Sequence, residues 1–136
     1  MYQLEVKRFL IEYRFPPDDG WSIHVDIDAM EPGKGPQNSE EKRRHARIAE
    51  EAMQALGVKI GPHPEFGRVD VVAHHEKHGL FLVEVEGSSS RQGEQALYSA
   101  LGQLVLQMRS SPHSYAIAVP EEPSWGKRLP KAVFTA

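Results

Sequence analysis

Three acidic residues, Asp70, Glu84 and Glu86, stand within two largely apolar stretches of this sequence. Glu84 and Glu86 are two residues apart, and in an extended strand such residues point to the same face, about 6–7 Å from each other. If the two stretches pair as an antiparallel hairpin, Asp70 falls almost opposite Glu84, and facing Cβ atoms are then about 4.5–5.5 Å apart. The spacing therefore predicts three carboxylates on one patch of a sheet.

The neighbours of these acids are mostly valine and leucine, which is typical of a central strand. A carboxylate there costs stability unless charge or hydrogen bonds compensate it, and clustered carboxylates take up a proton unless a cation lies among them. Mg2+ prefers oxygen ligands and binds through one or two carboxylates together with substrate phosphate. Because such a metal activates a water and stabilises charge on phosphate, the cluster predicts Mg2+- or Mn2+-dependent hydrolysis of phosphodiester bonds.

A less specific interpretation is that the acids lie at a strand end, compensated by water or by Arg68, Arg91 or Lys127. Two other polar groups indicate surface. One is the set of histidines at the expected turn, which lacks a helical metal-binding spacing: His74, His75 and His78. The other is Asp26 with Asp28, which the alternation of residues 21–29 places on a polar strand face, so we expect both to be solvated.

The acids must be positioned by a mixed α/β arrangement. In chain order the expected elements are a capped amphipathic helix over 39–56, strands at 58–60, 68–73 and 80–86, a helix over 91–108 and a strand at 115–119. The two acid-bearing strands are joined by a turn at 75–79, which makes them a hairpin.

The N-terminal region has a separate pattern. Residues 9–15 and 21–29 each alternate apolar and polar side chains with a period of two, and a breaker-rich segment lies between them. Folding back about Asp18 places Phe15 opposite Trp21, so that the large apolar side chains share one face. The pattern predicts an antiparallel β-hairpin that forms an N-terminal extension over residues 1–30.

The segments 67–73, 82–90 and 95–104 together resemble the core pattern of the PD-(D/E)XK nuclease superfamily. In that family an acid on one strand precedes an acid-any-lysine triplet on the next, and a helix often brings a glutamine to the site. The resemblance covers about residues 39–120. It implies a restriction-endonuclease-like αβββαβ core, with a mixed sheet flanked by helices, within a single domain of residues 1–136.

The resemblance implies a role for each matching residue. Asp70 and Glu84 would be metal ligands, Gln103 would stand near the metal or the substrate, and Glu50 is the candidate for an acid that some members add from the first helix. Glu86 stands where the family has its lysine, which helps to orient and activate the attacking water. Some restriction endonucleases of the superfamily carry glutamate at this place. Glu86 would then ligate a metal or accept the proton of the water as general base.

Two functions follow from this resemblance. The first is a metal-dependent nuclease acting on DNA rather than RNA, with Arg91 or Lys127 as the missing cation and a homodimer to cut both strands. The second is a catalytically inactive module on the same fold that binds nucleic acid or a protein partner. The lost lysine favours it, as does Val69, which replaces the proline that leads the family motif. An unrelated α/β interaction domain would be favoured if the three acids lay far apart.

Length and composition limit the class of protein. The 136 residues, 40% hydrophobic and 26% charged, suit one globular domain. The absence of cysteine excludes thiolate metal sites and disulfides and favours a reducing compartment. No apolar run is long enough to cross a membrane and no signal peptide is visible, so we expect a cytoplasmic location. A net charge of −3 argues against the broad positive field of a nucleic-acid coat protein.

Overall fold

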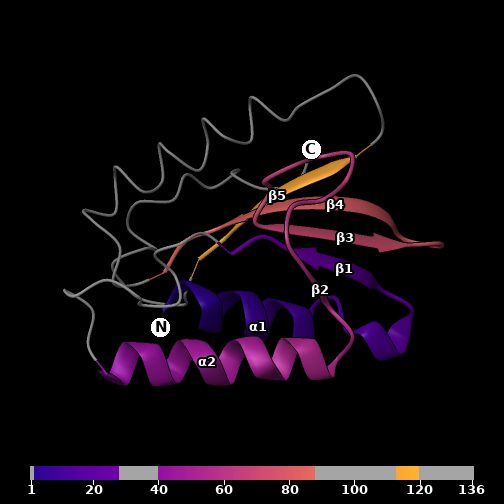
Figure 1. The fold of residues 1–136 in the computed structure, drawn as a ribbon. Helices are drawn as coiled ribbons and strands as arrows, with labels where there is room; N and C mark the ends of the chain where they lie inside the picture. The colour runs from indigo at the N-terminus through magenta and orange to yellow at the C-terminus, as the bar shows by residue number, and fades with distance from the viewer. Residues whose placement is uncertain (1, 28–39, 88–112, 120–136) are drawn as a thin grey trace.

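The structure is a computed structural model, and it describes residues 2–27, 40–87 and 113–119. Its elements in chain order are α1 (Gln3–Tyr13), the 3-10 turn η1 (Pro17–Asp19), β1 (Ser22–Val25), α2 (Glu40–Ala55), β2 (Lys59–Ile60), β3 (Val71–His75), β4 (Gly79–Val85) and β5 (Ser114–Ala118). Both helices lie on the same side of the sheet (Figure 1). The described part of the chain is therefore an α/β fold, as the sequence predicts.

The five strands form one mixed sheet in the order β2-β1-β3-β4-β5. β1 pairs in parallel with β2 and antiparallel with β3, β3 and β4 form the antiparallel hairpin, and β5 pairs in parallel with β4. The register of the hairpin places Val71 opposite Val83 and Val72 opposite Leu82. Since β3 and β4 each have a neighbour on both sides, the central-strand interpretation of the two acid-bearing stretches is confirmed.

Successive residues of β3 and β4 divide between two apolar clusters, because neighbours along a strand point to opposite faces. The cluster shared with both helices contains Val71, Ala73, Val83 and Val85 from these strands. The cluster on the other face contains Phe66, Val69, Val72, Leu82, Tyr115 and Ile117. A polar side chain in these strands therefore points towards one of these two apolar clusters, depending on its position.

The N-terminal segment is a helix, so the predicted β-hairpin over residues 1–30 is wrong. Phe9 and Tyr13 are four residues apart and lie on the exposed side of α1, with ring centroids 4.5 Å apart. Ile11 and Phe15 are also four apart, and both are buried. The period of two seen over residues 9–15 is thus two overlapping pairs with helical spacing.

The second half of the predicted hairpin is a strand, but its partners differ from the prediction. β1 lies inside the sheet between β2 and β3, with Ile23 opposite Ala73. The N-terminal region therefore supplies a central strand and a helix of the main core rather than an extension.

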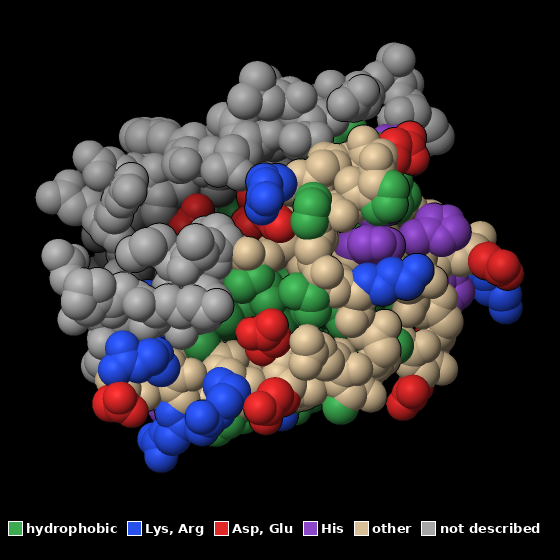
Figure 2. All heavy atoms as spheres, in the orientation of Figure 1, with side chains coloured by type: hydrophobic (Ala, Val, Ile, Leu, Met, Phe, Trp, Pro, Cys, Tyr) green, Lys and Arg blue, Asp and Glu red, His purple; other side chains and the backbone are tan. Residues whose placement is uncertain are grey.

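The other predicted elements are found with small shifts at their ends. The helix over 39–56 is α2, and the strands at 58–60, 68–73, 80–86 and 115–119 are β2, β3, β4 and β5. The predicted helix over 91–108 lies outside the described residues. Acidic and basic side chains are interspersed along α2 (Figure 2). Among the described helices, none has the length and apolar character that crossing a membrane requires.

Candidate functional site

Asp70 and Glu84 meet at the end of the β3–β4 hairpin. Asp70 directly precedes β3, and the pairing of Val71 with Val83 continues by one position to place Asp70 opposite Glu84. The carboxyl groups of the two residues share a hydrogen bond. The hairpin therefore brings these acids together as its register predicts.

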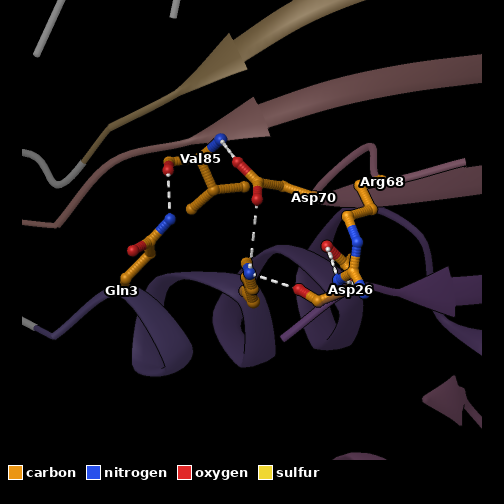
Figure 3. Close-up of polar contacts among 6 residues, drawn as sticks. Gln3, Asp26, Arg68, Asp70 and Val85 are labelled. Atoms are coloured by element: carbon orange, nitrogen blue, oxygen red, sulfur yellow. Dashed lines mark hydrogen bonds and ion pairs between the residues drawn. The ribbon is translucent and has the colours of Figure 1, made fainter. Parts of the chain in front are cut away.

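The Asp70 carboxylate is held by two different elements (Figure 3). Its Oδ2 accepts a hydrogen bond of 2.9 Å from the backbone N–H of Val85 on β4. Its Oδ1 lies 3.5 Å from the Nζ of Lys7 on α1. The Asp70 side chain is 19% exposed, so it reaches the surface, and its contacts with Val85 and Lys7 orient its two oxygens.

Glu84 lies in an apolar environment. It is 3% exposed and stands between the buried Val83 and Val85. Burial, and then the hydrogen bond to Asp70 and the negative charge of that residue, raise the pKa of Glu84 to about 10, while the Lys7 ammonium opposes this shift. At neutral pH, Glu84 therefore keeps its proton and donates it to Asp70.

Lys7 is a residue of this site that the sequence analysis missed. The residue is fully buried, and its Nζ donates a hydrogen bond of 2.6 Å to the backbone carbonyl of Asp26. Its spacing from Leu4 and Ile11 places it on the buried stripe of α1. A lysine in such a stripe signals a buried cation with acidic partners, but the signal is visible only if this segment is taken as a helix.

Asp26 is also part of the site, and the prediction that it is solvated is wrong. Asp26 is 7% exposed, and its backbone N–H donates a 3.0 Å hydrogen bond to the backbone carbonyl of Asp70. Its carboxylate lies 3.2 Å from the Nη1 of Arg68, which is itself largely exposed. Arg68 thus pairs with Asp26 rather than with the acids of the hairpin. Asp28 lies outside the described residues.

The remaining predicted site residues are placed as follows. Glu86 directly follows β4, is half-buried, and donates its backbone N–H to the Ala118 carbonyl at 3.0 Å. Its negative charge is a further, smaller cause of the raised pKa of Glu84. Glu50 is half-buried on α2, and the contacts described for Asp70 and Glu84 do not include it. Gln103, Arg91 and Lys127 lie outside the described residues.

The histidines of the hairpin turn belong to the surface, as predicted. His74 and His78 are exposed, and the His75 ring hydrogen-bonds through Nε2 to the Asp19 carbonyl at 2.7 Å. Over residues 2–27, 40–87 and 113–119, no group of three or more histidines and acids is arranged to hold a metal ion. The donor set described here is therefore a pair of carboxyl groups rather than a complete cage.

This pair suits a hard divalent cation. Mg2+ is commonly held by one or two carboxylates, with water and phosphate as its other ligands. The Asp70 carboxylate has contacts from Val85, Lys7 and Glu84, and a bound cation would take the place of the proton that Glu84 keeps. The residues thus fit a metal bound in exchange for that proton.

When this chain is compared with protein families, curated proteins and solved structures, no match is found.

Proposed function

We propose that this protein is a divalent-metal-dependent nuclease that hydrolyses phosphodiester bonds, in DNA rather than RNA, at the site formed by Asp70 and Glu84. The observation that carries the proposal is the facing carboxyl pair at the end of two apolar strands. Such a pair is unfavourable unless a proton or a cation lies within it. Mg2+ or Mn2+ is the cation that suits its oxygen donors.

In this proposal the residues divide the chemistry between them. Asp70 and Glu84 hold the ion, which when bound supplies an activated water and offsets charge on the phosphate. Glu86, two residues beyond Glu84, takes the proton of the attacking water as general base. The exposed guanidinium of Arg68 borders the site beside Asp26 and is available to a substrate phosphate.

We further propose that the fold is restriction-endonuclease-like. β1, β3 and β4 are consecutive neighbours, each antiparallel to the next, and β5 is parallel to β4. This order supports an αβββαβ core if α1 is its first helix, in place of the predicted helix over 39–56, and if α2 with β2 is an insertion. The first helix then brings Lys7 to the acids, where the resemblance suggested an acid such as Glu50.

The alternative is a catalytically inactive module on this fold that binds nucleic acid or a protein. One observation favours it: the polar groups of the site already satisfy one another. Asp70 accepts from Val85, lies beside Lys7 and shares a hydrogen bond with Glu84. A site that has ceased to bind metal would retain such a network for stability alone.

Cleavage of supercoiled plasmid, linear duplex DNA and single-stranded DNA, with Mg2+ and Mn2+ supplied separately, tests the proposal. We expect metal-dependent cleavage that falls by about 100-fold or more in Glu84→Ala. Glu76→Ala is the matched control, because Glu76 is an exposed carboxylate at the far turn of the same hairpin. If neither metal supports cleavage while the protein still binds DNA, the inactive module is the better description.

A further inference from the structure

The ammonium of Lys7 lies among the acids at the ends of β1, β3 and β4. It donates to the Asp26 carbonyl at 2.6 Å and lies 3.5 Å from Asp70 Oδ1, and Lys7 is 0% exposed. Burying an ammonium is unfavourable unless opposite charge and hydrogen bonds compensate it. An apolar residue at position 7 would continue the stripe of Leu4 and Ile11 without that cost. The site therefore retains a charge that packing of α1 does not need.

The acids around Lys7 are the negative charges that its ammonium compensates. Asp70 Oδ1 lies 3.5 Å from the Lys7 ammonium, Glu84 faces Asp70, and Glu86 adds negative charge near Glu84. A phosphodiester approaching this patch would bring yet another negative charge. Asp26 is paired with Arg68 at the rim, whereas the Lys7 charge lies beside Asp70 and also lowers the pKa of Glu84.

The attachment of α1 gives Lys7 a fixed place relative to the strand that carries Glu84. Gln3, one helical turn before Lys7, donates from Nε2 to the Val85 carbonyl at 2.8 Å. The N–H of the same residue, Val85, binds Asp70 Oδ2. Helix, strand and Asp70 carboxylate are thus joined through one residue of β4 (Figure 3).

We propose that Lys7 is a positioning residue of the metal site: acting through Asp70 Oδ1, it fixes the carboxylate opposite Glu84 and supplies the positive charge that the acids of the hairpin require. This inference rests on the proposed nuclease function and assigns α1 a part in it. A lysine that merely supports the fold would stabilise the protein without affecting reaction geometry selectively.

A positioning role and a purely structural role of Lys7 predict different effects of Lys7→Met. Without Lys7, Asp70 keeps its bond from Val85 and can still ligate a metal, and the repulsion between ammonium and metal ion is lost. Mn2+ affinity should then stay within about threefold. Cleavage should fall by about 100-fold, because reaction rates are sensitive to displacements of about 1 Å. A purely structural lysine would instead weaken folding and metal binding together.

The experiment measures Mn2+ binding by calorimetry and single-turnover cleavage of plasmid for wild type, Lys7→Met and Lys77→Met. Lys77 is exposed at the hairpin turn and serves as the matched control. Lys7→Arg keeps a positive charge at position 7 and should cleave at least about tenfold faster than Lys7→Met. The proposal is overturned if Lys7→Met cleaves like Lys77→Met. It is also overturned if Lys7→Met loses Mn2+ binding in proportion to cleavage and Lys7→Arg restores neither.

If Lys7→Met does not fold, Lys7→Gln takes its place, because a glutamine amide can also donate a hydrogen bond to the Asp26 carbonyl. Lys7→Gln should lose cleavage by about 100-fold while its Mn2+ affinity stays within about threefold of wild type, and cleavage equal to that of Lys77→Met would overturn the proposal. A wild-type protein with neither Mn2+ binding nor cleavage removes the proposed function, and this inference with it. A wild type that cleaves, beside a Lys7→Met variant that cleaves equally, removes only the role of Lys7.

Discussion

Asp70 and Glu84 face each other one position beyond the paired residues of β3 and share a single hydrogen bond. This hydrogen bond and the negative charge of Asp70 both favour the protonated form of Glu84. The Lys7 ammonium lies on the Asp70 side of this pair, and Glu86 adds negative charge near Glu84. If the pair binds a divalent cation as proposed, this cation and the proton on Glu84 would compete for the same carboxyl groups, so a higher pH should favour the metal.

The first prediction concerns stability against pH in metal-free buffer. Glu84 has an ordinary pKa of 4.5, which burial and then Asp70 raise to about 10 in the folded protein. Between these values the folded state binds more protons than the unfolded state, so the contribution of Glu84 is complete below pH 4.5 and is lost as pH rises toward 10. Glu84→Gln keeps a neutral side chain at every pH, and at pH 8 it should be more stable than wild type by about 1–3 kcal/mol.

Urea unfolding between pH 4 and pH 9, with chelator present, measures this difference. The stability difference between Glu84→Gln and wild type should become smaller as the pH falls towards 4. Glu76→Gln removes an exposed carboxylate of the same hairpin and should leave the pH dependence of wild type unchanged. A Glu84→Gln variant with the same pH slope as wild type would contradict the proton-sharing pair.

The second prediction concerns metal. A divalent ion that binds only the folded protein stabilises it by about 2.7 kcal/mol at 100 times its Kd. We expect Mn2+ to raise Tm by several degrees at pH 8 and less at pH 5, where the proton on Glu84 competes better. Asp70→Asn should lose this response because it removes a ligand. Thermal unfolding over a Mn2+ series checks it, and an equal response in Asp70→Asn would mean that the ion binds elsewhere.

The third prediction separates a helix from a strand at the N-terminus. Ile11→Ala should cost about 2–5 kcal/mol, since Ile11 is fully buried in the main cluster. Phe9→Ala should cost less than about 1 kcal/mol, since Phe9 is 53% exposed. In a β-hairpin, Phe9 and Ile11 would lie on the same face, and the two substitutions would lower the free energy of unfolding by similar amounts. Urea unfolding of both variants therefore decides, and equal losses would be inconsistent with α1.

The fourth prediction concerns the turn after α1. Gly20 has φ of +99°, and a Cβ built there would lie 3.0 Å from His75 Nε2, the atom that contacts the Asp19 carbonyl. Gly20→Ala should cost about 1–3 kcal/mol through backbone strain and displacement of that ring. Gly57→Ala is the comparison, since its φ is +85° but a Cβ there meets open space. Free energies of unfolding measure both, and a larger loss at Gly57 would contradict the contact with His75.

The part of the site that depends on local sequence was predictable. The hairpin is closed by a short turn ending at Gly79, which has φ of +86°, and its strands have apolar residues on both faces. Once that turn is located, the register follows, and with it the position of Asp70 opposite Glu84. Pairing of this kind needs no information from distant segments.

The part that depends on distant segments was not predictable from the pattern. Residues 9–15 satisfy both a period of two and the i, i+4 spacing of a helix, and only packing against the sheet distinguishes them. The wrong period concealed Lys7, and it gave β1 the wrong partner. The wrong period also predicted that Asp26 is solvated. In the structure, β1 lies between two strands and Asp26 lies beside Asp70 at the end of β3.

The hydrogen bond from Gln3 to Val85 joins positions 82 residues apart in the chain. Contacts of such separation close slowly, whereas a hairpin with a short turn forms early in folding. Asp70 and Glu84 are therefore expected to meet before α1 docks and brings Lys7 to them. Until α1 docks, the shared proton is the only compensation for the two acids of the hairpin. We therefore expect acidic conditions to favour formation of the hairpin, and docking of α1 with Lys7 to complete the site.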